Sequence, residues 1–415
     1  MTRLVGHADL VAARELLAGV TRVTPLEPCR PVAAAVAGPA WLKCENLQRA
    51  GSFKVRGAYV RISRLSPEER ARGVVAASAG NHAQGVALAA RWCGTAATVY
   101  MPEGAALPKV AATRGYGATV ELVGQTVDDA LAAAQEHAAR TGAVFIHPFD
   151  HPDVIAGQGT VGLEIVEQCP DVATVVTAVG GGGLISGVAA AVRAVRPQVR
   201  VVGVQAAGAA AFPPSLQAGH PVRLPAPRPA TGAEPPPPAT IADGIAVGRP
   251  GDLTYAHVSK LVDEIVTVSD EDISRALLVL LERVKLVVEP AGAVAVAALL
   301  SGAVAVETPV VAVLSGGNID PLLMLRVIEH GLAAAGRYLH FTVRCLDRPG
   351  RLAALLTQIA EHGANVVDVS HQRYRPELGI GEVEVALSVE TRGVAHSDAL
   401  LSGLRTAGYQ VTLNR

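Results

Sequence analysis

The chain has 415 residues, half of them apolar, which is too many for one compact core and predicts two or three domains. Its formal net charge is −1, so composition gives no electrostatic reason to expect a nucleic acid or an acidic membrane surface as a partner. Charged residues interrupt the N-terminus at Arg3, Asp9 and Arg14, which argues against a secretory signal peptide and favours a cytoplasmic protein.

The first motif with chemical content is Ser52-Phe53-Lys54, which follows Glu45-Asn46-Leu47-Gln48. Lysine can form a Schiff base with an aldehyde cofactor, and it needs a crowded, desolvated setting to do so at neutral pH. On spacing alone, a solvated surface lysine is the simpler interpretation of Lys54. The polar sequence Ser78-Ala79-Gly80-Asn81-His82, a short way further on, favours a functional site instead.

Residues 74–146 alternate between apolar β-branched runs and alanine-rich helical patterns. The predicted strands are 74–77, 97–100, 119–123 and 144–146, and the predicted helices are 81–91, 109–114 and 127–140. Alternation of this kind is typical of a parallel sheet with helices on both faces.

The second motif is a run of four glycines, 180–183, between a predicted buried strand at 175–179 and a predicted helix at 184–192. A strand, a glycine loop and a helix start present bare N–H groups and the positive end of the helix dipole to a phosphate. A dinucleotide fingerprint does not fit, because Ser186 stands where glycine or alanine is required and the next strand ends at Gln205 rather than at an acidic residue. An ATP-binding loop does not fit either, since no Gly-Lys-Ser/Thr follows.

Residues 213–238 are rich in proline and end in Pro235-Pro236-Pro237-Pro238. So much proline argues against helix and sheet interior and predicts an extended surface excursion.

The third motif is a predicted buried strand at 311–314 followed by Ser315-Gly316-Gly317-Asn318. Ser315 would lie at the carboxyl end of the strand, where ligands bind in open α/β sheets. On its own, an ordinary βα turn capped by a serine explains this motif.

The pattern changes after Gly336. The predicted strands are 338–345, 365–371, 382–389 and 409–413, and the predicted helices are 351–362 and 397–406. The order is βαββαβ, with a turn at Asp347-Arg348-Pro349-Gly350.

Together, Lys54, the Ser-Ala-Gly-Asn-His loop, the four glycines and Ser315 resemble the tryptophan synthase β-type pyridoxal phosphate enzymes and, within them, the threonine ammonia-lyases. The resemblance begins at Thr24-Pro25-Leu26 and continues into the C-terminal module. It implies an α/β fold with two parallel-sheet lobes, in which residues 1–336 form the catalytic domain and about 51–150 form a small mobile lobe within it.

The resemblance also implies the roles of individual residues. The cofactor-binding residues implied in this way are Phe53, Lys54, Asn81, Gly181, Gly182, Gly183, Leu184 and Ser315. The implied substrate-binding residues are Ser78, Gly80 and His82. Lys54 would anchor pyridoxal 5'-phosphate and remove the Cα proton, while Ser315 would face the pyridine nitrogen. Glu289 could line the back of the site or act as an acid at a helix N-terminus.

The implied reaction is β-elimination of L-threonine to 2-oxobutanoate and ammonia, in isoleucine biosynthesis or threonine catabolism. Serine dehydratase or serine racemase chemistry is the alternative, because a single methyl group is worth only ~1–3 kcal/mol of discrimination. A non-catalytic amino-acid sensor is a third possibility, against which Lys54 argues.

No metal is expected. Serine racemases hold a divalent cation on an acidic pair, whose positions here correspond to Gln205 and Ala211. His147 and His151 are four residues apart, but Pro148 argues against a helix that would pair them, so we interpret both as loop residues.

Residues 337–415 resemble an ACT domain, a module that binds amino acids at subunit interfaces. The turn at 347–350 and the sequence Gly363-Ala364-Asn365-Val366 match its ligand site and imply effector contacts at Asp347, Gly350 and Asn365. The alternative is a domain that only dimerises. Either way, the resemblance implies a homo-oligomer, a dimer or tetramer.

Overall fold

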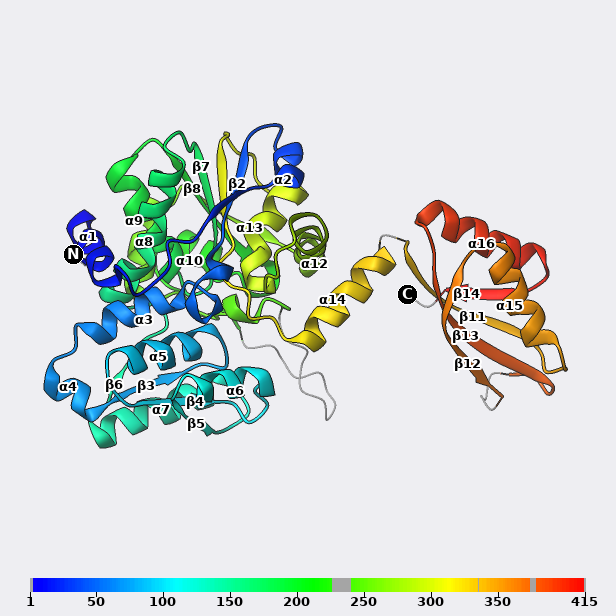
Figure 1. The fold of residues 1–415 in the computed structure, drawn as a ribbon, viewed down its shortest axis with the longest axis horizontal. Coiled ribbons are helices and arrows are strands. Elements are labelled where there is room, and N and C mark those ends of the chain that lie inside the picture. Colours follow the sequence, from blue (N-terminus) through cyan, green and yellow to red (C-terminus); the bar gives the residue numbers. More distant parts are fainter. Residues whose placement is uncertain (1–2, 226–239, 335, 374–377, 414–415) are drawn as a thin grey trace. The chain divides into compact units, whose positions relative to one another are not determined.

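The computed structural model describes residues 3–225, 240–334, 336–373 and 378–413 (Figure 1). The chain divides into two compact units, Met1–Pro321 and Leu322–Arg415. The division falls ahead of the expected boundary at 336/337, because helix α14 (Pro321–Ala334) groups with the C-terminal unit. The assignment of residues 1–336 and 337–415 as functional domains stays a prediction.

The larger sheet of the N-terminal unit has six strands in the order β1-β2-β10-β7-β8-β9 within the described residues. Their bounds are β1 Leu26–Pro28, β2 Ala40–Lys43, β7 Thr174–Ala178, β8 Arg200–Ala206, β9 Glu264–Val268 and β10 Val310–Val313. All neighbours pair in parallel except β1 and β2, which are antiparallel. The carboxyl ends of β7 and β10 therefore lie at the same edge of the sheet.

Helices cover both faces of this sheet (Figure 1). On one side are α1 (His7–Leu17), α8 (Pro152–Gln168) and α9 (Gly183–Val195), and α11 (Asp252–Leu261) packs against α9. On the other side are α2 (Arg30–Ala35), α12 (Asp270–Val279) and α13 (Pro290–Ser301). A sheet covered on both faces needs apolar strands, and every residue of β7 and β10 is buried.

The smaller sheet has four parallel strands in the order β5-β4-β3-β6 in the described part of the chain. Its strands are β3 Val74–Ala77, β4 Ala97–Met101, β5 Thr119–Leu122 and β6 Val144–Phe145. The helices around it are α3 Lys54–Ser63, α4 Pro67–Arg72, α5 Asn81–Trp92, α6 Leu107–Gly115 and α7 Val127–Thr141. The alternation predicted for residues 74–146 is confirmed, with boundaries shifted by one or two residues.

One prediction for the proline-rich region is wrong. Pro213 and Pro214 do not lie in an extended segment, because both belong to the first turn of helix α10 (Phe212–Ala218). The first helical N–H groups have no partner within the helix, so proline is tolerated there. The run Pro235–Pro238 lies outside the described residues.

Short helical turns complete the unit. They are η1 Glu45–Leu47, η2 Arg49–Gly51, η3 Ala207–Ala209, η4 Asp243–Ile245 and the π-type turn η5 Leu280–Val284. In the parts of the chain that the structure describes, no helix is long and apolar enough to cross a membrane.

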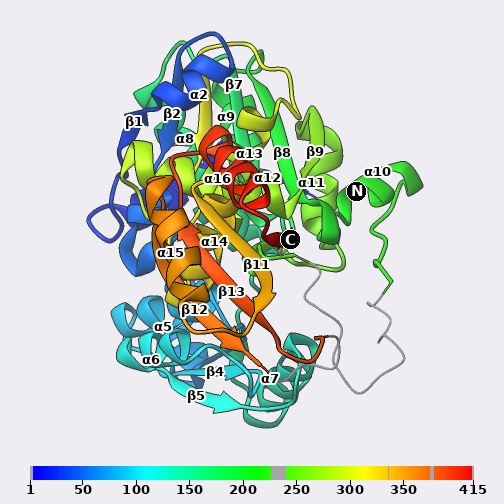
Figure 2. The same ribbon diagram turned by 90° about the vertical axis from the view of Figure 1, so that its right-hand side faces the viewer.

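The C-terminal unit has the predicted βαββαβ order after α14. Its elements are β11 Tyr338–Leu346, α15 Arg351–Glu361, β12 Asn365–Gln372, β13 Glu382–Glu390, α16 Val394–Thr406 and β14 Gln410–Leu413. The strands form an antiparallel sheet in the order β12-β13-β11-β14, with α15 and α16 against it (Figure 2). The core of the unit includes Phe341, Leu355, Val385 and Leu404.

Candidate active site

A cavity of about 490 Å³ in the N-terminal unit brings together the motifs of the sequence. It lies where the loops after β3, β6, β7 and β10 meet the first residues of α3 and α13. Its lining includes Phe53, Lys54, Ser78, Gly80, Asn81, His82, Gly181, Gly182, Gly183, Leu184 and Ser315. A cavity of this size is typical of small-molecule sites.

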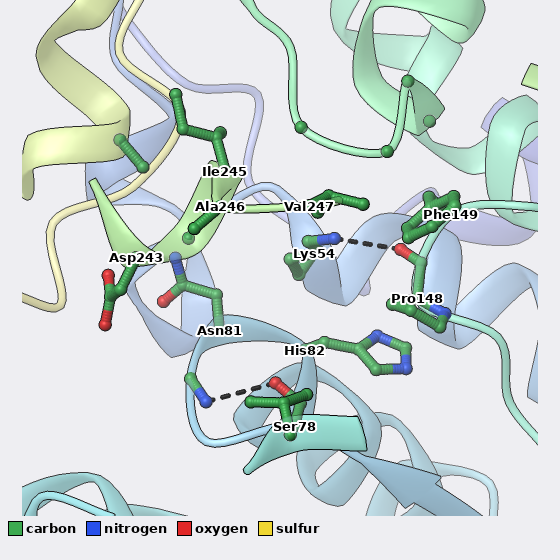
Figure 3. Close-up of a pocket in the computed structure, with 18 of the residues that line it drawn as sticks. Lys54, Ser78, Asn81, His82, Pro148, Phe149, Asp243, Ile245, Ala246 and Val247 are labelled. Carbon is green, nitrogen blue, oxygen red and sulfur yellow. Dashed lines mark hydrogen bonds between the residues drawn. The ribbon is translucent and has the colours of Figure 1, made fainter. Parts of the chain in front are cut away.

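Lys54 is the first residue of α3, and its side chain points into the cavity (Figure 3). Its Nζ donates a hydrogen bond to the carbonyl oxygen of Pro148 at 2.9 Å. Burial lowers the pKa of Lys54 to about 8, and the Glu289 carboxylate opposes this shift only in part. Because a neutral amine is the nucleophilic form, Lys54 is suited to bond with an aldehyde at physiological pH.

Phe53, the residue before Lys54, is hydrogen-bonded to the loop that follows β10. The backbone N–H of Phe53 donates to the carbonyl oxygen of Ser315 at 3.2 Å. The Ser315 side chain is 3% exposed, and its Oγ lies 3.4 Å from the carbonyl oxygen of Ala291. The loop that carries Ser315 and the start of α3 are thus fixed against each other.

The glycine loop joins β7 to α9. Gly182 has φ +97°, a left-handed conformation that favours glycine, and α9 begins at the next residue. A Cβ on Gly181 would lie 2.4 Å from the ring of Phe149, and one on Gly183 would lie 2.8 Å from the Cβ of Phe149. The first N–H groups of a helix have no partner within it. A bare backbone at a helix start, lining a cavity, fits a phosphate group.

The Ser78–His82 loop enters the cavity from β3. The N–H of Gly80 donates to Ser78 Oγ at 3.1 Å, which orders the turn before α5. His82 is 4% exposed, and its Nε2 lies 2.8 Å from the carbonyl oxygen of Ile146. Since a carbonyl only accepts, Nε2 carries the proton. Burial lowers the pKa of His82 to about 3, so the ring is neutral at physiological pH.

Asn81 links the two sides of the cavity. Its amide Nδ2 donates to Oε1 of Glu289, and its Oδ1 accepts from Nδ2 of Asn318 at 2.8 Å. Asn318, which the sequence motif contained without a role, therefore orients Asn81. Glu289 precedes α13 but makes no side-chain cap to it; the carboxyl lines the cavity instead. Burial, with the charge of Asp243 adding to it, raises the pKa of Glu289 to about 7.

Several residues line the cavity that the sequence did not assign to the site. Asp243 lies in η4, and its Oδ2 is 2.6 Å from Nζ of Lys109 on α6, so an ion pair joins the larger sheet's loops to a helix of the smaller sheet. His147 also lines the cavity, and burial lowers its pKa to about 4. These residues come from segments far apart in the chain, and no local pattern marks them.

Both expected loop histidines lie outside regular structure. His147 Nδ1 accepts from the N–H of Asp150 at 2.8 Å, and His151 precedes α8, where its Nδ1 accepts from the N–H of Asp153 at 3.1 Å. Gln205 and Ala211 are buried; Oε1 of Gln205 accepts from the N–H of Phe212 at 2.9 Å. Among the residues that the structure describes, no cluster of three or more His, Cys, Asp or Glu is arranged to hold a metal ion.

The expected effector residues lie in the C-terminal unit. Asp347 follows β11 and forms an ion pair with Arg373, whose Nε is 2.8 Å from its Oδ2. Gly350 precedes α15 with φ +84°, and Asn365 begins β12 and donates to Oε2 of Glu390 at 3.1 Å. Their role as an effector site stays a prediction.

One cavity thus contains a buried lysine with a lowered pKa, a glycine loop suited to a phosphate and the neutral hydroxyl of Ser315. These features fit an α/β enzyme with a phosphate-bearing aldehyde cofactor. The family model of the pyridoxal-phosphate dependent enzymes matches residues 17–316. The chain belongs to this family, and its cofactor is pyridoxal 5'-phosphate.

The chain is similar to several known proteins. The chain is 47% identical over 405 residues to an L-threonine ammonia-lyase of Thermotoga maritima, covering 98% of both chains. The crystal structure of a threonine deaminase from T.th. shares 40% identity with a TM-score of 0.70, over 76% of this chain and 99% of that one. Maize serine racemase shares 34% identity with a TM-score of 0.72, over 80% of this chain and 99% of that one.

Proposed function

We propose that the protein is an L-threonine ammonia-lyase that converts L-threonine to 2-oxobutanoate and ammonia. The observation that carries this proposal is the similarity over nearly the whole length to the Thermotoga maritima protein of that name. The cavity supports it, because it contains both Lys54, whose pKa is lowered, and Ser315, whose side chain is a neutral hydroxyl rather than a carboxylate.

The cofactor would be held from three sides. The N–H groups of Gly181, Gly182, Gly183 and Leu184 would bind the phosphate, and Lys54 would bond to the aldehyde carbon. Phe53 would pack against the ring, Asn81 would donate to its phenolic oxygen, and Ser315 would face its nitrogen with a neutral hydroxyl. When bound, pyridoxal phosphate supplies an electron sink for negative charge at Cα.

Lys54 is the proposed base. With substrate and cofactor bound, the Nζ of Lys54 would accept the Cα proton. Loss of the β-hydroxyl with one proton, as water, completes the elimination, and hydrolysis of the resulting enamine releases ammonia and 2-oxobutanoate. Because the Ser315 hydroxyl is a weaker proton donor than a carboxylic acid, it would leave the ring nitrogen largely unprotonated and favour expulsion of the β-substituent.

The substrate carboxylate would lie at the loop of Ser78, Gly80 and His82. A neutral His82 whose Nε2–H is bonded to Ile146 cannot offer that proton to a carboxylate. We therefore infer that hydroxyl and backbone N–H groups of the loop, rather than a charged imidazole, bind the carboxylate.

Serine racemase or serine dehydratase activity is the second candidate, favoured by the likeness to the maize serine racemase structure. The test is to incubate the purified protein separately with L-threonine and L-serine and to quantify 2-oxobutanoate, pyruvate and D-serine. We expect the highest kcat/KM for 2-oxobutanoate formation. A higher kcat/KM for D-serine formation would identify a serine racemase instead. If neither substrate is turned over, the remaining interpretation is a non-catalytic amino-acid sensor.

We further propose that the C-terminal unit is an ACT-like regulatory domain in a cytoplasmic homo-oligomer, a dimer or tetramer, that serves isoleucine biosynthesis or threonine catabolism. Its βαββαβ order and antiparallel sheet support this. An amino-acid effector such as isoleucine or valine would contact Asp347, Gly350 and Asn365. Calorimetry on the full-length protein tests it: heat on adding isoleucine or valine is expected, and the absence of heat would leave a dimerising role.

A further inference from the structure

The loop between β6 and α8 contacts both the lysine and the glycine loop. Within it, the carbonyl of Pro148 accepts from Lys54 (Figure 3). The ring of Phe149 lies against Gly181. The next residue, Asp150, has a half-buried carboxylate whose partners all lie in a third segment. That segment is the start of α11.

Asp150 accepts three backbone hydrogen bonds from the first turn of α11. Its Oδ1 accepts from the N–H groups of Leu253 and Thr254, both at 3.0 Å, and its Oδ2 accepts from the N–H of Asp252 at 3.1 Å. A Cβ on Gly251 would lie 2.2 Å from Oδ1 of Asp150, so the residue before the helix has no room for a side chain. A carboxylate at a helix N-terminus also interacts favourably with the helix dipole.

The first turn of α11 in turn holds the glycine loop. Thr254 is fully buried, and its Oγ1 donates to the carbonyl oxygen of Gly181 at 2.6 Å. A second contact runs from Oγ of Ser186, on α9, to the carbonyl oxygen of Thr254 at 3.3 Å. The β-carbon of Thr254 would be 2.8 Å from a Cβ on Gly182, so the two backbones approach closely.

The direction of the Gly181 carbonyl determines the direction of an N–H group that could bind a phosphate. It belongs to the same planar peptide unit as the N–H of Gly182, and in a trans peptide these two groups point in opposite directions. A hydrogen bond that fixes the carbonyl on the Thr254 side therefore fixes the N–H on the other side. Gly182 is one of the residues that line the cavity.

We propose that Asp150 is a positioning residue for the phosphate of the cofactor. It orders the start of α11, Thr254 then fixes the Gly181 carbonyl, and the N–H of Gly182 is held ready for the phosphate. This inference rests on the proposed phosphate-binding role of the glycine loop.

The test compares a ligand that has the phosphate with one that lacks it. Cofactor-free wild-type and Asp150→Asn proteins are titrated with pyridoxal 5'-phosphate and, separately, with pyridoxal, and both Kd values are measured by visible absorbance. Asparagine keeps the size but turns an N–H donor toward the N–H of Asp252. We expect a roughly tenfold rise in the Kd for pyridoxal phosphate, the scale on which supporting partners of a bound group act, with an unchanged Kd for pyridoxal.

A second variant and a matched control make the result specific. Thr254→Val removes the hydroxyl and keeps the volume, and it should produce the same selective loss even if Asp150→Asn folds poorly. The double variant should lose no more than the larger single effect, because both act through one path. Asp129→Asn removes a comparable carboxylate that accepts from the N–H groups of Gln125 and Thr126 ahead of α7, and it should leave both Kd values unchanged.

The outcomes distinguish a failure of the proposed phosphate site from a failure of the role proposed for Asp150. If wild-type protein binds pyridoxal as tightly as pyridoxal phosphate, the glycine loop is not the phosphate site and the proposed cofactor arrangement fails. If the wild type prefers the phosphate but Thr254→Val retains that preference, or Asp150→Asn weakens both ligands equally, Asp150 has only a structural role.

Discussion

At the scale of single residues, Lys54 and Glu289 have pKa values that move toward each other. Burial lowers the pKa of Lys54 to about 8 and raises that of Glu289 to about 7. A protonated lysine cannot attack an aldehyde, so the cofactor-free protein should take up pyridoxal phosphate faster as pH rises, with a midpoint near pH 8.

Glu289→Gln tests the cause of that midpoint. The Glu289 carboxylate raises the pKa of Lys54, so its removal should move the midpoint of the uptake rate below pH 8. Stopped-flow absorbance across a pH series measures this. Glu167→Gln, which changes an exposed carboxylate paired with Arg14, should leave the midpoint in place. A midpoint near the ordinary lysine value of about 10 in the wild type would contradict the account.

The residues proposed for the site from the sequence line one cavity, but their hydrogen-bond partners were not predictable. Lys54, Asn81 and Ser315 are singled out because their motifs together resemble a known family, although Lys54 and Ser315 each have a simpler interpretation alone. The acceptor of Lys54, the carbonyl of Pro148, is a backbone group 94 residues away and carries no side-chain signature. Glu289 is ambiguous in the sequence, because a position before a helix suits both a cap and a cavity residue.

At the scale of elements, α3 is fixed by a buried cluster of charges. Arg56 is 1% exposed; its Nε and Nη2 donate to Glu45 at 2.8 Å each, and its Nη1 donates to Glu164 at 2.6 Å. Lys43 also pairs with Glu164. Burial alone would raise the pKa of Glu45, but the charge and hydrogen bonds of Arg56, together with Thr24 and Lys43, lower it. The cluster holds the helix that begins with Lys54.

Arg56→Met should destabilise the protein by ~3–5 kcal/mol, because it leaves two buried carboxylates without their main partner. Urea unfolding followed by circular dichroism measures the loss. Arg275→Met removes an exposed cation paired with Glu271 and should lower the free energy of unfolding by less than ~1 kcal/mol. Equal losses in the free energy of unfolding would show that the buried cluster stabilises the protein no more than an exposed ion pair does.

Gly182→Ala tests the glycine loop. At φ +97° an alanine is strained, and its Cβ would lie 2.7 Å from the ring of Phe212. Gly219→Ala is the matched control, because Gly219 has φ +77° and open space around it. We expect Gly219→Ala to lower the free energy of unfolding by roughly 1–2 kcal/mol and to leave cofactor affinity unchanged. Gly182→Ala should lower the free energy of unfolding more and also weaken cofactor binding. Unchanged cofactor affinity would contradict the assignment of this loop as the phosphate site.

Element type was predictable where the local pattern is strong. Residues 174–178 are a β-branched run before glycines, and they form the buried strand β7. The prediction for Pro213 and Pro214 is wrong because proline density indicates extended chain only on average, whereas position within the first helical turn decides whether proline fits. Composition averages over a window and misses this positional effect.

At the scale of the whole molecule, the lining of the cavity runs from Phe53 to Ser315 and so lies within the N-terminal unit. A chain ending at Pro321 should therefore keep threonine turnover. If the C-terminal unit binds isoleucine or valine, a coupling of ~1–3 kcal/mol would change the apparent threonine affinity several-fold in the full chain, and the shortened chain should lose that response. Measuring KM for threonine with and without each amino acid, in both chains, gives the answer; a response that survives truncation would place the effector site elsewhere.

Pairings between distant segments could not be read from the sequence. Lys109 and Asp243 meet because the loops of the two sheets converge on one cavity, and the connection of Asp150 to α11 has the same origin. Hydrophobic periodicity and turn residues report neighbours along the chain. Contacts of this kind depend on strand order, here β1-β2-β10-β7-β8-β9. In this order β10, the last of these strands in the chain, lies between β2 and β7.

The central claim is that Lys54 anchors pyridoxal phosphate in this cavity. Borohydride reduction of the protein loaded with the cofactor, followed by peptide mass spectrometry, tests it most directly. We expect the visible absorbance of the bound cofactor to disappear on reduction and one cofactor-derived label per chain to appear on the peptide that contains Lys54. Label on a different lysine, or an Lys54→Ala protein that still turns over threonine at the wild-type rate, would contradict the account.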